Sequence, residues 1–175
     1  MPKNQPAVNE NYTEKPLALK PRLNKFTEKF IQTDADTIFD LVDAFGSPLN
    51  LMFPQVIEEN INSFQSVYDR HNIQGRIYVS TKQNKSAAAL KQAALSNVGV
   101  DVSSENALKF ALGCGFDAGR MEATGPKNRE YLTLSIQHGI TINADNFEEL
   151  DQIRDIRKSL GKKEKTPVFI RLAGF

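Results

Sequence analysis

The chain has 175 residues, and its 22 Lys and Arg against 21 Asp and Glu give a formal net charge of +1. This balance argues against a dedicated nucleic-acid-binding protein, because such proteins carry a strong positive charge. No stretch approaches the roughly 18 consecutive apolar residues of a membrane span, and the start of the chain lacks the apolar core of a signal peptide. The single cysteine, Cys114, excludes an internal disulfide framework and a multi-cysteine zinc site. We therefore expect a cytoplasmic protein with neither a nucleic-acid nor a membrane partner.

The N-terminal region is expected to contain little regular structure before the first helices. Residues 1 to about 21 are polar and contain four prolines, a composition typical of an extended arm or a disordered tail. Apolar residues at 23–31 then recur at helical spacing. A second helix should begin at the N-cap pair Thr33–Asp34 and end at Gly46.

After Gly46 the sequence alternates between short apolar runs and amphipathic segments. Six strands are expected, beginning near residues 48, 76, 98, 120, 140 and 167. The helices between them are expected at 56–71, 86–96, 105–112, 129–138 and 147–160. Strands that alternate with helices at this spacing predict parallel βαβ units with right-handed crossovers.

Two α/β architectures fit this alternation. One is an open doubly wound sheet of six strands. The other is a (β/α)₈ barrel, which typically needs about 250 residues and is therefore incomplete here. The glycine-rich phosphate loops that often follow the first strand of a doubly wound sheet are not present, but the pattern by itself leaves both architectures open.

Two side chains stand where chemistry is expected in a parallel α/β fold. Lys82 follows the apolar strand at 76–80, and Asp101 lies in the apolar run at 98–102. Active sites of these folds gather at the carboxyl ends of the strands, and a lysine there can form a Schiff base. The alternatives are a solvated loop lysine at 82 and, at 101, a helix cap, for which Ser103 and Ser104 are better placed.

These residues belong to a longer series of motifs that resembles the ornithine/diaminopimelate decarboxylases. That family comprises pyridoxal-phosphate (PLP) enzymes with an alanine racemase-like barrel of fold type III. The resemblance covers residues 34–175 and is carried by Phe45–Leu49, Lys82–Asn84, Asp101–Ser104, Ala111–Gly115, Thr124–Lys127, Gly139–Leu150 and Val168–Leu172. It divides the chain into residues 1–33, a polar extension with a short helix, and residues 34–175, the N-terminal part of the barrel with about six βα units.

The resemblance implies the roles of three residues. Lys82 would form the Schiff base with PLP, while Asp101 and Arg171 would line the cofactor at the strand ends. It further implies an amino-acid decarboxylase with a small-molecule amino-acid substrate and a homodimeric full-length form. The substrate itself is not readable from the motifs.

Other readings of the same resemblance are a catalytically inert or regulatory homologue and a single-domain PLP-binding carrier. Ala107 stands where the family pattern has a glutamate, which favours the inert homologue, whereas the retained Lys82 favours the enzyme. With six of eight barrel units, the sequence is expected to be a truncated or partial chain that is inactive alone.

The remaining polar side chains are expected to be structural or solvated. Lys127 lies at a strand-end turn where it could approach a phosphate, but an ordinary loop lysine is the favoured interpretation. Cys114 is expected in a helix-ending turn. His71 and His138 are expected as cations at helix C-termini. A mixed-charge, solvated helix face is expected from Glu148, Glu149, Asp151, Arg154, Asp155, Arg157 and Lys158.

Overall fold

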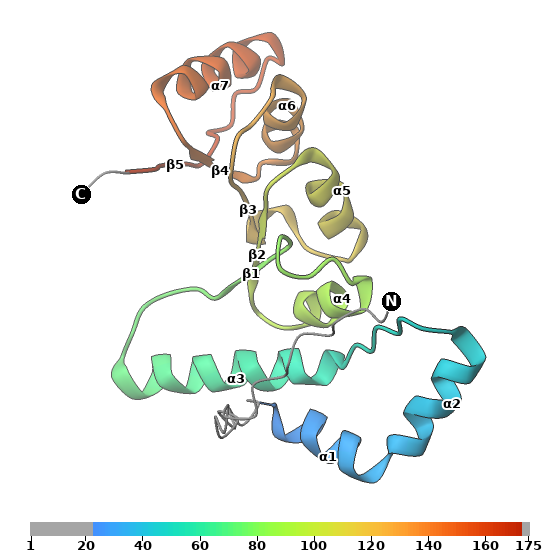
Figure 1. Cartoon of the computed structure of the whole chain (residues 1–175). Helices are drawn as coiled ribbons and strands as arrows, with labels where there is room; N and C mark the ends of the chain where they lie inside the picture. The colour runs from blue at the N-terminus through green and yellow to red at the C-terminus, as the bar shows by residue number, and fades with distance from the viewer. Residues whose placement is uncertain (1–22, 173–175) are drawn as a thin grey trace, which may run out of the picture.

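The computed structural model describes residues 23–172 of the chain (Figure 1). The helices are α1 (Lys25–Thr33), α2 (Ala35–Phe45), α3 (Pro54–His71), α4 (Ala87–Leu95), α5 (Glu105–Gly113), α6 (Arg129–His138) and α7 (Phe147–Ser159). The strands are β1 (Tyr78–Ser80), β2 (Gly99–Val102), β3 (Met121–Ala123), β4 (Thr141–Ala144) and β5 (Val168–Ile170). A short 3-10 helix, η1 (Ala118–Arg120), precedes β3. The extended arm expected at residues 1–21 lies outside the described residues.

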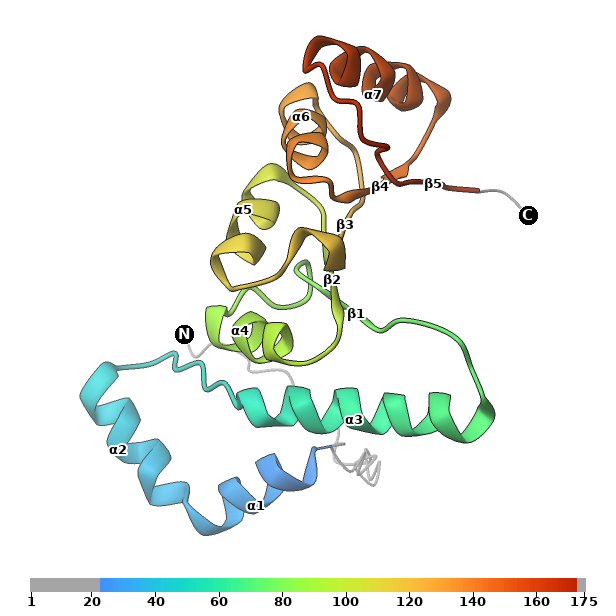
Figure 2. The same ribbon diagram turned by 180° about the vertical axis from the view of Figure 1, so that it is seen from behind.

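The strands form one parallel sheet in which each pairs with the next along the chain, in the order β1-β2-β3-β4-β5. Helices α4 to α7 lie on one side of this sheet in both views (Figures 1 and 2). A doubly wound sheet reverses its strand order and carries helices on both faces, so this part of the chain is not doubly wound. The α/β architecture is confirmed as a partial wall of a parallel (β/α) barrel.

One expected strand is wrong. Residues 48–53 form no strand, so the described chain has five strands instead of six. Pro48 cannot donate to a strand ladder, and the next proline, Pro54, already begins α3. The segment instead places the Phe53 ring against Phe26 and Phe30, with ring centroids 5.4 and 5.1 Å apart. Phe53 therefore packs against α1, whereas Leu51 and Met52 are exposed.

The expected helices are all present, with boundaries shifted by at most about two residues. Local capping explains several of the starts, because Ser86, Ser104, Asn128 and Asn146 each accept a backbone N–H of the helix that follows. Asp34 occupies the N-cap of α2 but makes no such bond. Its carboxylate instead accepts a hydrogen bond from the Thr33 hydroxyl. Gly46 ends α2 as expected, with φ of +85°.

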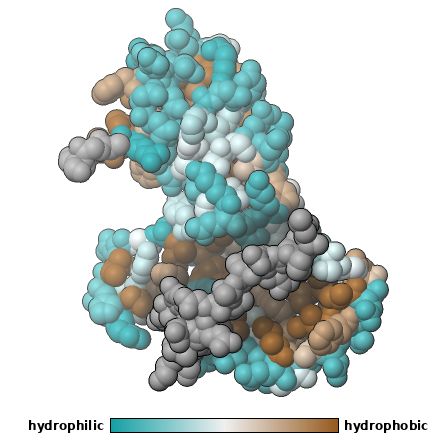
Figure 3. Space-filling model, in the orientation of Figure 1, coloured by the Kyte–Doolittle hydropathy of each residue, from teal (hydrophilic) through white to brown (hydrophobic). Residues whose placement is uncertain are grey.

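The hydrophobic core lies between the sheet and helices α4 to α7. Its fully buried members include Leu90, Val100, Leu108, Leu132 and Ile142. Helices α1, α2 and α3 contain no buried residue. Figure 3 shows brown apolar surface in the lower half of the molecule, over these three helices, where large side chains such as Phe39, Phe45 and Phe64 are exposed. Among residues 23–172, no helix has the length and apolar character that a membrane crossing requires.

Candidate active site

The three predicted site residues lie at the carboxyl edge of the sheet. Lys82 stands two residues after β1, Asp101 lies near the end of β2, and Arg171 directly follows β5. Because all the strands run parallel, their carboxyl ends meet at one edge, which is where active sites of such folds form. No hydrogen bond or ion pair joins the three side chains directly within residues 23–172. The fold therefore places them along one edge without bringing them into contact.

Hydroxyl groups at the ends of both neighbouring strands hold the Asp101 carboxylate: Ser80 is the last residue of β1, and Thr124 directly follows β3. Ser80 Oγ lies 3.1 Å from Asp101 Oδ2, and Thr124 Oγ1 donates to Asp101 Oδ1. The helix cap considered for Asp101 is instead made by Ser104, whose Oγ accepts the Ala107 N–H at 3.1 Å. Two donors from opposite sides restrict the rotamer of the half-buried Asp101 side chain, so that it stays at the strand ends.

Lys82 is exposed, and its amine lies beside the turn that follows β3. A Cβ placed on Gly125 would stand 3.9 Å from Lys82 Nζ. Gly125 has φ of +70°, a conformation that glycine adopts without strain. Within the described chain, Lys82 Nζ makes no hydrogen bond or ion pair, although its backbone N–H lies 3.4 Å from Ser80 Oγ. The amine is therefore accessible to a ligand at this edge.

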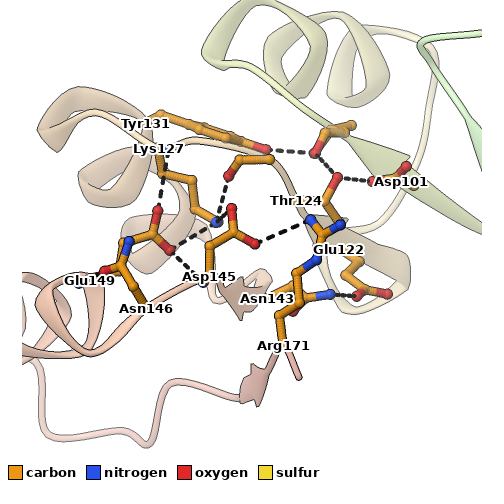
Figure 4. A network of polar contacts seen from close by, with 12 residues as sticks. Asp101, Glu122, Thr124, Lys127, Tyr131, Asn143, Asp145, Asn146, Glu149 and Arg171 are labelled. Atoms are coloured by element: carbon orange, nitrogen blue, oxygen red, sulfur yellow. Dashed lines mark hydrogen bonds and ion pairs between the residues drawn. The ribbon is translucent and has the colours of Figure 1, made fainter. Parts of the chain in front are cut away.

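Arg171 is held at the sheet edge by one backbone and one side-chain contact. Its N–H donates to the Ala144 carbonyl oxygen at 2.9 Å, which continues the ladder between β4 and β5. Its Nη1 lies 3.4 Å from Asp145 Oδ1, a contact drawn as a dashed line in Figure 4. The side chain is 60% exposed. Asp145 is therefore the acidic partner of the predicted cofactor-lining arginine.

Lys127 lies in the loop after β3, as predicted, but it is not a solvated loop lysine. Its side chain is fully buried, and Nζ lies 2.9 Å from Glu149 Oε2, 3.7 Å from Asp145 Oδ2 and 2.6 Å from the Gly125 carbonyl oxygen. The turn at Gly125 directs Lys127 inward, and the cap residue Asn128 then begins α6. A buried cation needs such compensation, because an isolated charge is costly to remove from water.

Glu149 is also an exception to the solvated helix face expected for α7. It lies in the first turn of α7 and is 5% exposed, while the other members of that set are exposed or half-buried. Its Oε2 accepts the Asp145 N–H at 3.0 Å, and Oε1 accepts the Lys127 N–H at 3.3 Å. Lys127 and Glu149 thereby connect the loop after β3 to the loop after β4 (Figure 4).

Tyr131 connects this region to β2. Its hydroxyl donates to the Val102 carbonyl oxygen at 2.7 Å, next to Thr124 (Figure 4). Burial raises the pKa of Tyr131 well above its ordinary value, and the negative charge of Asp101 raises it further. The phenol is therefore a neutral hydrogen-bond donor that fixes the backbone beside Asp101.

The predicted site residues did not include several polar residues that the structure places at this edge, namely Ser80, Thr124, Asp145 and the Lys127–Glu149 pair. Thr124, Lys127, Asp145 and Glu149 all belong to motifs that the sequence presents after strands, so those motifs were the available signal. Their contacts could not be predicted from the sequence, because these depend on which loops lie next to each other in the folded chain. The other assignments agree with their positions: Cys114 is a buried cap of α5, and His71 and His138 end α3 and α6.

The family of the chain follows from comparison with known proteins. Residues 55–174 match the model of the pyridoxal-dependent decarboxylase family, at its pyridoxal binding domain. The chain therefore belongs to the pyridoxal-dependent decarboxylases, as its motifs predicted, and the predicted cofactor, PLP, is confirmed.

A diaminopimelate decarboxylase among the matched relatives agrees with this assignment. The chain is 30% identical over 139 residues to a diaminopimelate decarboxylase of Bacillus methanolicus, covering 78% of this chain and 32% of the relative. It is 32% identical over 136 residues to an uncharacterized protein of Sinorhizobium fredii, covering 77% of this chain and 30% of that protein. The chain thus spans about a third of the length of the curated relatives it matches.

Solved structures show the same architecture. The diaminopimelate decarboxylase of M. jannaschii, in complex with L-lysine, aligns with a TM-score of 0.68 at 26% identity, covering 77% of this chain and 32% of that one. An arginine decarboxylase of Paramecium bursaria Chlorella virus aligns with a TM-score of 0.63 at 19% identity, covering 78% and 36%. The second likeness concerns the fold alone.

The residues at the carboxyl edge fit PLP. An aldehyde cofactor needs an accessible primary amine, which Lys82 offers beside the Gly125 turn. A charged heteroaromatic ligand also needs fixed polar groups around it, and Asp101 and Arg171 carry opposite charges at the same edge. The residues present at this edge are therefore chemically compatible with PLP.

Proposed function

We propose that the protein is a PLP-dependent amino-acid decarboxylase in which Lys82 Nζ holds the cofactor covalently. The observation that carries the proposal is the accessible Lys82 amine at the carboxyl edge of a parallel sheet, in a chain of the pyridoxal-dependent decarboxylase family. When bound, PLP supplies an electron sink for the carbanion that remains after a carboxylate leaves as carbon dioxide.

The chain's own residues would orient the cofactor and set the charge around it. Asp101 would present a carboxylate that Ser80 and Thr124 hold in place. Arg171 would present a guanidinium from the end of β5, the edge strand opposite β1. Groups held in place before the reaction need no reorganisation during it, so they stabilise developing charge efficiently. The hydroxyls of Ser80 and Thr124 thus serve the site by restricting Asp101.

The substrate class is proposed to be a free α-amino acid. Two relatives, a diaminopimelate decarboxylase and the M. jannaschii structure solved with L-lysine, support a basic or diamino acid. A homodimer in the full-length form and a cytoplasmic location are further parts of the proposal, as is the division at residue 33. Light scattering of the purified protein tests the dimer.

The central test is to map the lysine that PLP modifies. The longest natural form of the protein is incubated with PLP, reduced with borohydride and digested for mass spectrometry. We expect one modified lysine, Lys82, and loss of the label in Lys82→Arg. Lys85→Arg is the matched control, because Lys85 is also exposed and lies three residues away on the same loop, and it should keep the label. Labelling elsewhere, or none, would contradict the proposal.

Carbon dioxide release from a panel of basic and diamino acids then tests the reaction. We expect release from at least one of them, and no release by Lys82→Arg. A protein that is labelled at Lys82 but releases no carbon dioxide from any amino acid would be an inert homologue or a PLP carrier instead. For the 175-residue chain by itself, we expect neither tight PLP binding nor turnover.

A further inference from the structure

Asp145 stands between a buried cation and an exposed one. Its Oδ2 lies 3.7 Å from Lys127 Nζ, whose side chain is fully buried, while its Oδ1 lies 3.4 Å from Nη1 of Arg171, which is 60% exposed. Figure 4 shows the three side chains in one continuous chain of polar contacts. The carboxylate therefore has one oxygen on the interior side and one facing the carboxyl edge of the sheet.

Glu149 fixes both the backbone and the charge environment of Asp145. Its Oε2 accepts the Asp145 N–H at 3.0 Å and lies 2.9 Å from Lys127 Nζ. Lys127 is itself fixed by the Gly125 carbonyl oxygen at 2.6 Å. Because every one of these partners is buried or half-buried, the position of Asp145 is determined from the interior of the protein.

The orientation of the exposed Arg171 side chain depends on the position of Asp145 more than that of a buried arginine would. An exposed arginine has many rotamers and loses substantial conformational entropy when it is held in one of them. Asp145 is the acidic group within ion-pair distance of Arg171 among residues 23–172. A carboxylate that is itself immobile restricts the guanidinium more effectively than a mobile surface partner would.

We propose that Lys127 and Glu149 are positioning residues for Arg171, and that they act by holding Asp145 Oδ1 toward the guanidinium. This inference rests on the proposed function, in which Arg171 lines the cofactor. Through Asp145, the buried pair thus sets the position of the Arg171 side chain at the proposed cofactor site. Lys127 and Glu149 themselves do not contact the cofactor in this proposal.

A double-mutant cycle on PLP affinity tests the inference. Absorbance titration of PLP is carried out with the longest natural form of the protein and its variants Lys127→Met, Arg171→Gln and the double variant. We expect Lys127→Met and Arg171→Gln each to raise the dissociation constant about five- to tenfold, and the double variant to match Arg171→Gln within about twofold. If Lys127→Met does not fold, the variant Lys127→Met/Glu149→Leu, which leaves no uncompensated buried charge, takes its place in the same cycle.

The inference would be overturned if Lys127→Met raised the PLP dissociation constant by the same factor in the presence and in the absence of Arg171. A purely structural effect is independent of the arginine. An Arg171→Gln variant with unchanged PLP affinity would overturn it as well. Arg154→Gln is the matched control: it breaks an exposed pair with Asp151 at 2.6 Å on α7 and should leave the dissociation constant unchanged. Borohydride mapping of the unmodified protein keeps the two proposals separate, since a label at Lys82 with an additive cycle contradicts only the positioning role.

Discussion

Lys127 Nζ and Glu149 Oε2 lie 2.9 Å apart, and their side chains expose 0% and 7% of their surfaces. The two residues belong to different loop–helix junctions, one after β3 and one after β4. A buried pair of this kind is costly to break, because removal of one partner leaves the other charge buried without compensation. This ion pair is thus one of the contacts that hold the junctions after β3 and β4 together.

Removal of one member of this pair should destabilise the fold strongly. For Lys127→Met or Glu149→Gln we expect the free energy of unfolding to fall by about 3–5 kcal/mol, measured by urea denaturation. The double variant Lys127→Met/Glu149→Leu should recover most of this loss, because it leaves no uncompensated charge. Arg154→Ala, which breaks an exposed pair, should cost about 0–1 kcal/mol. Equal effects at the buried and exposed pairs would show that the burial of Lys127 contributes nothing.

The Thr124 hydroxyl group should contribute more to stability and PLP binding than the volume of the side chain does. Thr124→Val keeps the volume but removes the donor to Asp101, and we expect it to lower the free energy of unfolding by about 1–3 kcal/mol and to weaken PLP binding. Thr124→Ser should preserve both properties. Thr133→Val is the control, because the Thr133 hydroxyl donates to a carbonyl oxygen within α6, away from the site. The interpretation fails if Thr124→Val and Thr124→Ser bind PLP equally well.

Tyr131 should make the protein sensitive to alkaline pH. Its pKa is raised in the folded state by burial and by Asp101, so the unfolded state ionises near pH 10, before the folded state does. The unfolded state then binds fewer protons, and the free energy of unfolding should fall as the pH rises above about 10. Below pH 10 both states keep the proton, so the stabilisation is fully present there. Tyr131→Phe should show a shallower decrease in urea titrations between pH 9 and pH 11, and an unchanged slope would refute this role.

Gly99 should not tolerate a side chain. A Cβ at this position would stand 2.4 Å from Tyr78 Cε1 and 2.9 Å from the Arg120 carbonyl oxygen. The tyrosine ring can move, but the Arg120 backbone is held between η1 and β3: its N–H donates to the Asp117 carbonyl oxygen, and the next residue, Met121, pairs with Val100. We expect Gly99→Ala to lower the melting temperature, at a cost of about 1–3 kcal/mol. Gly113→Ala, at a helical position with open space around it, should instead be neutral or stabilising, and the idea is wrong if both variants behave alike.

Local sequence determined much of the architecture. The alternation of short apolar runs with amphipathic segments predicted β1 to β5 and α3 to α7, because that periodicity arises from which side of an element faces the core. The motifs around Lys82, Asp101 and Arg171 predicted the family, which the comparisons confirm. The roles of these three residues stay predictions. The apolar run at 48–53 was misjudged because a strand needs a partner as well as an apolar sequence.

The motifs favoured the barrel over the doubly wound sheet, and the tertiary structure confirmed that choice and located the buried charges. Periodicity is the same in a barrel wall and in a doubly wound sheet, whereas the strand order and the single helical face distinguish them. Lys127 appears in the sequence as an ordinary loop lysine, and Glu149 as one charge on a mixed helix face. They form a buried pair because the folded chain brings together two residues that are 22 positions apart in the sequence. No local sequence pattern predicts that contact. The sequence by itself therefore predicted which side chains reach the carboxyl edge, and the tertiary structure decided what holds them there.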